Sequence, residues 1–179
     1  ENNICVQVFR WSDASYLEGQ DMFHMSGMHR DVYLYATPKA FVHDHYITAE
    51  LNSAFNGGSM NVALEIENRD TVDVQKNIEI ELIAPDGNLV AEKNITVDLD
   101  AGIKNVKKNV TFDALESLLP WTAETPTLYT VVVRQKDSFG SEEMVFSTKY
   151  GFRRIEIKNG VVLINGQRVY FKGVNTQDT

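Results

Sequence analysis

Residues 60–66 read MNVALEI, and apolar and polar side chains alternate along them. Val62, Leu64 and Ile66 fall on one face of an extended chain, and Glu65 falls on the other. A period of two places the first set in a core and the glutamate in water, as in an antiparallel sheet with one buried face. This stretch therefore predicts a half-buried β-strand.

The same pattern recurs along most of the chain. The sequence PDGN at 85–88 is typical of a tight hairpin turn, since Gly and Asn tolerate positive φ. About seven short strands with turns between them favour an all-β fold, an immunoglobulin-like β-sandwich with flanking partial segments. Only 113–119 suggests a helical turn. The further strands are expected over 46–51, 78–82, 89–97, 104–112, 127–135 and 143–150.

The two ends differ from this middle region. Short strand-like runs occur at 6–9 and 31–36, and the residues between them, 10–30, follow neither period. A loop of this length with aromatic and acidic residues is often a binding element. Near the other end, Asn159-Gly160 predicts a type I′ hairpin turn between 155–157 and 161–164. Asn165-Gly166 predicts a second turn, leading into a strand over 169–172.

Composition excludes several functions. Lys and Arg total 17 against 25 Asp and Glu, a net charge of −8, which argues against binding to nucleic acid or to anionic membranes. No apolar run reaches the roughly 18 residues that a bilayer span requires. The single cysteine, Cys5, cannot form an internal disulfide. The chain opens with Glu1 rather than Met, which we interpret as a piece of a longer protein, and its compartment is left open.

Three stretches bracket the whole chain and combine rare residues at fixed spacing. They are Arg10-Trp11-Ser12-Asp13 with Tyr16-Leu17-Glu18, Gln20-Asp21-Met22, Met25-Ser26-Gly27 and Arg30-Asp31-Val32; Leu119-Pro120-Trp121 with Ala123-Glu124, Pro126 and Leu128-Tyr129; and Gly151-Phe152-Arg153 to Gly173-Val174-Asn175. Together, and in this order, they resemble the β-galactosidase branch of glycoside hydrolase family 2. This family joins a sugar-binding jelly roll, an immunoglobulin-like sandwich and a (β/α)8 barrel.

The resemblance implies a domain order. Residues 1–37 would be the C-terminal end of the jelly roll, 38–150 the sandwich, and 151–179 a linking hairpin and the first barrel strand. The family hydrolyses terminal β-D-galactosides with two glutamates of the barrel, which would lie beyond Thr179. This chain is therefore expected to be a non-catalytic scaffold of a retaining β-galactosidase, with no catalytic residue of its own. A β-glucuronidase or β-mannosidase parent remains an alternative.

The resemblance also implies two substrate-binding residues. Asp21, in the Gln-Asp-Met stretch, would contact the galactosyl unit and help to hold a sodium ion, and a carboxylate suits both tasks. Asn175, after the first barrel strand, would lie near the mouth of the barrel. Sodium and magnesium are implied for the longer protein. Its expected partners are the neighbouring domains, a β-galactoside and further copies of itself. Residues 176–178, Thr-Gln-Asp, depart from the basic, histidine-rich run of related enzymes, which leaves the specificity open.

Other residues suggest less specific chemistry. Neighbouring carboxylates such as Asp98 and Asp100, or Glu142 and Glu143, are more often a solvated face than a catalytic pair. His43 and His45 share one face of a strand and could bind zinc, but no further cluster supports such a site. For Arg30 and Asp31 we expect a structural ion pair.

The aromatic residues separate a scaffold from a binding module. We expect Trp121 and Tyr129 to be core anchors, with the Tyr129 hydroxyl tying a corner. The alternative from another functional class is a freestanding carbohydrate-binding or adhesion module. Exposed Trp11, Tyr16 and Phe23 beside Asp21 would favour that alternative.

Overall fold

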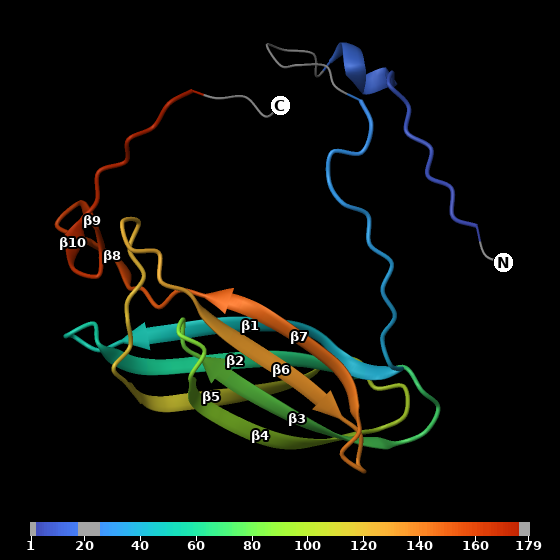
Figure 1. Cartoon of the computed structure of the whole chain (residues 1–179). Coiled ribbons are helices and arrows are strands. Elements are labelled where there is room, and N and C mark those ends of the chain that lie inside the picture. Colours follow the sequence, from blue (N-terminus) through green and yellow to red (C-terminus); the bar gives the residue numbers. More distant parts are fainter. Residues whose placement is uncertain (1–2, 18–25, 176–179) are drawn as a thin grey trace. The chain divides into compact units, whose positions relative to one another are not determined.

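The computed structural model of the chain describes residues 3–17 and 26–175. Its contacts divide the chain into two units, one of residues 36–169 and one of residues 1–35 with 170–179. The first unit contains every strand of the described residues (Figure 1).

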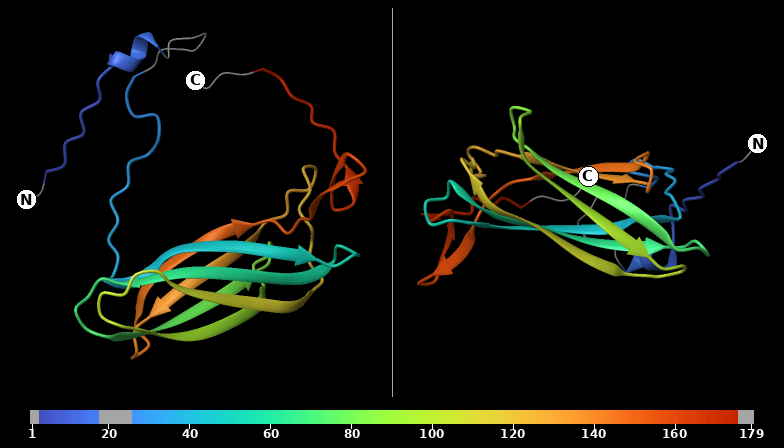
Figure 2. Two further views of the ribbon diagram at one scale, coloured as in Figure 1. Left: turned by 180° about the vertical axis from the view of Figure 1, so that it is seen from behind. Right: turned by 90° about the horizontal axis from the view of Figure 1, so that it is seen from below.

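The larger unit is a β-sandwich, and the predicted all-β immunoglobulin-like fold is confirmed. One sheet has the order β1-β2-β5 and the other has the order β4-β3-β6-β7, all with antiparallel neighbours. Figures 1 and 2 show the two sheets lying face to face. The strands are β1 (Ala40–Leu51), β2 (Gly57–Asn68), β3 (Val74–Ile83), β4 (Leu89–Leu99), β5 (Val106–Glu116), β6 (Tyr129–Lys136) and β7 (Glu142–Tyr150).

The core lies between the two sheets and follows the predicted period of two. In β2 the side chains of Val62, Leu64 and Ile66 are fully buried. From the facing sheet, Ile80 of β3 and Val133 of β6 are buried against them in one cluster. Removing these aliphatic side chains from water supplies about 1.5–3 kcal/mol for each, which makes the alternation the main determinant of the fold.

The predicted helical turn over 113–119 is not formed, and its first two residues make a β-bulge near the end of β5. β5 remains paired with β2 up to Glu116, but Asp113 and Ala114 together face the single residue Ser59. Ala114 takes a positive φ of 53°, as one residue of a bulge often does. The prediction of a helical turn was wrong because the bulge interrupts the period of two and hides the strand pattern.

The hairpin predicted after the sandwich is present. It forms a third sheet, of order β10-β9-β8, with strands β8 (Ile155–Lys158), β9 (Val161–Ile164) and β10 (Gln167–Arg168). Asn159-Gly160 has φ values of 51° and 75°, and Asn165-Gly166 has 49° and 74°, so each turn has two consecutive positive φ values. This confirms the predicted turns, because a type I′ turn requires that combination.

One residue of the second turn fastens this small sheet to the sandwich. The buried Asn165 side chain accepts a hydrogen bond from the Arg154 amide and donates one to the Trp121 carbonyl, both at 2.9 Å. Beside it, the ring of Phe55, from the β1–β2 turn, lies under the Arg154 guanidinium at 4.5 Å. The hairpin is thus held by contacts to two separate loops of the sandwich.

Among its described residues, the second unit contains one short helix and extended chain. The 3-10 helix η1 (Asp13–Tyr16) is capped at Ser12, whose amide donates to Ser15 Oγ at 2.9 Å. The strands predicted at 6–9, 31–36 and 169–172 are not formed. The runs at 6–9 and 31–36 have strand-like sequences, but a strand needs a neighbour for its backbone hydrogen bonds, and none of the described residues provides a ladder for them. After β10, Val169 still donates to the Val162 carbonyl at 3.2 Å, but the paired strand itself ends at Arg168.

Candidate functional site

The two residues expected to contact a sugar receive no support from contacts. Asp21 lies outside the described residues. Asn175 is described, and it is an exposed residue outside any strand. Their roles in binding a galactoside or sodium therefore stay predictions.

Three of the four carboxylates considered for catalysis, Asp98, Glu142 and Glu143, lie in contacts within the sandwich. Asp98 accepts a hydrogen bond from Gln75 Nε2 at 2.7 Å. Glu142 pairs with Arg134 at 3.2 Å, and Glu143 pairs with Lys76 at 2.7 Å. A general acid and a general base need different, substrate-facing environments, which these contacts do not provide. These carboxylates were expected to form a solvated face rather than a catalytic pair; Glu143 departs from that expectation, because its side chain is only 24% exposed and pairs with Lys76.

The two histidines of β1 point to different partners. A register shift between Val42 and Asp44 makes His43 an extra residue, and its ring lies 3.7 Å from the Glu67 carboxylate. His45 instead forms a hydrogen bond of 2.7 Å with Thr148 Oγ1. Within residues 3–17 and 26–175, no group of three or more His, Cys, Asp or Glu side chains is arranged to hold a metal.

Tyr129 is the core anchor that was expected, whereas Trp121 lies outside the core cluster and the expected ion pair of Arg30 is not formed among the described residues. The buried Tyr129 hydroxyl accepts a hydrogen bond from the Leu119 amide at 2.9 Å, which is a tyrosine corner. Trp121 is half-buried, with its ring against the backbone of Gly151. Asp31 accepts a hydrogen bond from the Tyr33 hydroxyl at 2.9 Å, and no ion pair with Arg30 forms among the described residues.

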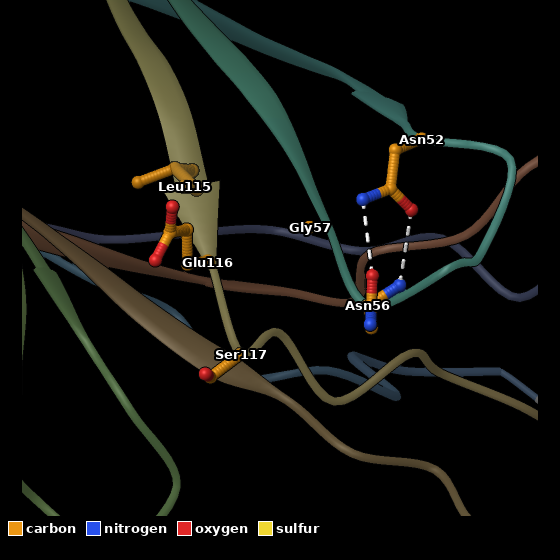
Figure 3. A pocket seen from close by; sticks show the side chains of 6 residues that line it. All are labelled: Asn52, Asn56, Gly57, Leu115, Glu116 and Ser117. Atoms are coloured by element: carbon orange, nitrogen blue, oxygen red, sulfur yellow. Dashed lines mark hydrogen bonds between the residues drawn. The ribbon is translucent and has the colours of Figure 1, made fainter.

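A polar cleft of about 350 Å³ lies where the β1–β2 turn meets the end of β5. Figure 3 shows Asn52 and Asn56 facing each other across two hydrogen bonds, of 3.0 and 3.2 Å. Asn52 Nδ2 donates to Asn56 Oδ1, and the Asn56 backbone N–H donates to Asn52 Oδ1, so both polar ends of the Asn52 side chain are used within the turn and offer little for recognising a ligand. The lining residues are Asn52, Asn56, Gly57, Leu115, Glu116 and Ser117.

A second cleft, of about 420 Å³, has a different character, and we call it the cationic cleft. It carries two cations and no carboxylate. Lys149 Nζ donates to Thr130 Oγ1 at 2.7 Å, and the Arg153 guanidinium stacks on the Trp121 ring at 4.8 Å. Burial raises the pKa of the Tyr150 hydroxyl, and the charge of Arg153 opposes part of that shift. The lining residues are Leu128, Lys149, Tyr150, Gly151, Arg153 and Ile155.

Sequence reasoning missed this cleft. Leu128 and Arg153 stood in recognised stretches, but nothing local showed that β7 brings Lys149 beside them. The useful signal was a pair of cations, Lys149 and Arg153, four residues apart in a strongly acidic chain.

Two further observations concern the rival functions. Trp11 and Tyr16 are exposed, as a carbohydrate-binding module would require, while Phe23 and Asp21 fall outside the described part of the chain. No helix among the described residues has the length and apolar character needed to cross a membrane.

Two family models match most of the chain. The model described as "Glycosyl hydrolases family 2" matches residues 40–153, and the model described as "Glycosyl hydrolases family 2, sugar binding domain" matches residues 1–38.

Curated relatives cover the chain from end to end. A β-galactosidase of Priestia megaterium is 37% identical over 178 residues, which are 99% of this chain and 17% of that protein. One of Halalkalibacterium halodurans is 35% identical with the same coverage. The chain thus spans about one sixth of the length of the curated relatives it matches.

Solved structures share the fold at lower identity. A β-glucuronidase 2 of Bacteroides uniformis superposes with a TM-score of 0.76 and 19% identity, over 87% of this chain and 20% of that one. A putative β-galactosidase from Bacteroides fragilis gives 0.67 and 22%, over 74% and 20%. At these identities the likeness establishes the fold alone.

Proposed function

Because this chain belongs to glycosyl hydrolase family 2, we propose that it is the non-catalytic connecting region of a longer β-galactosidase. In this proposal residues 1–37 complete a sugar-binding jelly roll, 38–150 are the spacer sandwich and 151–179 lead into the catalytic barrel. The relatives matched over 99% of the chain carry the name β-galactosidase, which favours that activity over β-glucuronidase or β-mannosidase.

The observation that carries the scaffold role is the engagement of the candidate acids. A retaining glycosidase needs two carboxyl groups about 5–5.5 Å apart that face one sugar. Glu142 and Glu143 are adjacent on a strand, and each is paired with a different cation of the sandwich. The described residues therefore supply rigidity and orientation, and the chemistry is assigned to other parts of the longer protein.

Asp21 and Asn175 remain our candidates for contact with the galactosyl unit. A carboxylate is a suitable ligand for a hard cation such as sodium or magnesium. Since no set of three acidic or imidazole side chains converges within residues 3–17 and 26–175, such an ion would need ligands from elsewhere in the protein. We also propose that the longer protein is a homo-oligomer.

The test compares this 179-residue chain with the full-length protein. Chromogenic β-galactoside, β-glucuronide and β-mannoside are offered to both. We expect the full-length protein alone to cleave, with the β-galactoside the best substrate. Turnover by the 179-residue chain would refute the scaffold role, and preference for another glycoside would refute the β-galactosidase assignment.

The second candidate is a carbohydrate-binding module, favoured by the exposed Trp11 and Tyr16. Galactose or lactose would then quench or shift the fluorescence of Trp11 in the 179-residue chain. Comparison with Trp11→Ala separates this signal from that of Trp121. Saturable binding that disappears in Trp11→Ala would support the module, and a flat titration would reject it.

A further inference from the structure

One face of the small hairpin sheet is aliphatic and open to solvent. The register pairs Ile155 with Ile164 and Ile157 with Val162, so these four side chains share a face. Ile155 is 58% exposed and Ile157 is 76% exposed. The opposite face carries charged residues such as Glu156. We call the four residues Ile155, Ile157, Val162 and Ile164 the aliphatic hairpin face.

This face continues into the cationic cleft, because Ile155 belongs to both. Leu128, which is 41% exposed, extends the apolar surface along the wall of the cleft. Lys149 and Arg153 are the two cations there, and neither has an ion-pair partner in the described ranges. Lys76, Lys107 and Arg134 of the sandwich pair with carboxylates, while Lys93 and Lys108 form no ion pair in the same ranges. What distinguishes Lys149 and Arg153 is that both line one cleft beside exposed aliphatic side chains. The surface therefore combines exposed aliphatic groups with unpaired positive charge.

A small sheet with β-branched residues facing water is an unfavourable surface unless something covers it. A second copy of this chain, placed with two-fold symmetry over the same patch, would bring the Lys149 and Arg153 of both copies together. That arrangement places like charges opposite one another, so charge favours a different, negatively charged occupant. The matched relatives are about six times longer than this chain, so their polypeptides contain ample sequence to supply one.

We propose that the aliphatic hairpin face and the cationic cleft form one docking surface for an acidic segment of the same longer polypeptide. A carboxylate of that segment lies between Lys149 and Arg153, and its aliphatic neighbours cover Ile155 and Ile157. The Arg153 guanidinium can donate two parallel hydrogen bonds to a carboxylate, which gives the contact direction as well as strength. The Trp121 ring stacks on one face of that guanidinium and limits its orientations. This inference rests on the proposed function, since it requires the chain to be part of a longer protein.

Amide hydrogen exchange tests the proposal. Exchange over 155–164 is compared between the 179-residue chain and the full-length protein. We expect it to be at least about tenfold slower in the full-length protein, because docking suppresses local opening of the hairpin. In full-length Lys149→Glu/Arg153→Glu the rates should return to within about twofold of the isolated chain. The matched control, Lys93→Glu, reverses an exposed cation of β4 and should leave the protection intact.

Three outcomes would overturn the docking surface. They are equal exchange in both proteins, protection that survives the double charge reversal, and protection of the isolated chain that grows with its concentration, which would identify a second copy. Exchange over 60–66 reports whether the sandwich still folds. If the double charge reversal unfolds the sandwich, the uncharged variant Lys149→Gln/Arg153→Gln is used instead, and its exchange over 155–164 should again return to within about twofold of the isolated chain. Hydrolysis by the unaltered full-length protein is measured separately, so loss of docking and loss of the proposed activity are distinguishable.

Discussion

Lys76 of β3 donates hydrogen bonds to both carboxylate oxygens of Glu143 of β7, each at 2.7 Å. Between these strands lies β6, whose buried Gln135 donates to the same carboxylate at 3.0 Å. Gln135 also accepts from the Val42 amide and donates to the Ala40 carbonyl. One polar network thus joins the sheet of β3, β6 and β7 to the first residues of β1, where the chain enters the sandwich.

Removing the cation of this network should destabilise the sandwich clearly. The Lys76 side chain is only 9% exposed and that of Glu143 is 24% exposed. Lys76→Met leaves a poorly hydrated carboxylate, and we expect a loss of about 2 kcal/mol in the free energy of unfolding by urea. This is below the range of fully buried pairs because Glu143 keeps some contact with water.

The control for this prediction is Lys107→Met, which removes a cation from the exposed pair with Glu65. Exposed pairs contribute little, so this variant should unfold almost as the original chain does. Equal losses in the two variants would contradict a special role for the Lys76–Glu143 pair.

The tyrosine corner gives a second prediction. Tyr129→Phe keeps the edge-to-face packing on Phe152, with centroids 5.0 Å apart, and removes only the acceptor of the Leu119 amide. Leaving that partly buried N–H without its partner should cost about 1–2 kcal/mol in urea unfolding. Tyr46→Phe, on the exposed face of β1, should be close to neutral. If Tyr129→Phe left the free energy of unfolding unchanged, water would be replacing the Tyr129 hydroxyl as the acceptor for the Leu119 amide.

The strands of the sandwich could be predicted because their signal is local. Alternation such as that of Val62, Leu64 and Ile66 decides which face of a strand is buried without knowledge of its partner. The strand-like runs at 6–9 and 31–36 failed for the complementary reason. A strand exists only when a neighbour satisfies its backbone, and a single sequence does not state which neighbours are near.

Side-chain partnerships over long sequence distances were beyond the same reasoning. The stretch containing Arg153 was recognised from the sequence. The stacking of Arg153 on Trp121 depends on how the chain folds back between them, which no local sequence pattern indicates. Likewise, Glu143 was interpreted as part of a solvated face, although Lys76, 67 residues away, holds it in the network. For Asp21 the sequence offers only the resemblance, and its surroundings lie outside the described residues.

The hairpin should depend on one asparagine and not on the other. Asn159 and Asn165 have nearly the same φ, 51° and 49°, and each precedes a glycine. Only Asn165 is buried and bonded through its side chain to Arg154 and Trp121. Asn165→Ala should therefore accelerate amide exchange over 155–164 by about tenfold, and Asn159→Ala should change it far less. Similar acceleration in both would assign the effect to backbone conformation alone.

Alkaline unfolding should reveal the environment of Tyr150. Burial raises the pKa of its hydroxyl above the ordinary value of 10.0, so the folded state holds the proton more tightly than the unfolded state does. The corresponding stability is fully present below about pH 10, and it is lost as the pH rises through the raised pKa of the folded protein. The free energy of unfolding should thus fall more steeply above about pH 10 in the original chain than in Tyr150→Phe.

Lysines and other tyrosines titrate in the same range, but they contribute equally to both proteins and cancel in the difference. Tyr35→Phe, which removes an exposed hydroxyl, should retain the steep decline. If Tyr150→Phe declines as steeply as Tyr35→Phe, the Tyr150 hydroxyl is hydrated in solution and the wall of the cationic cleft is open at that point.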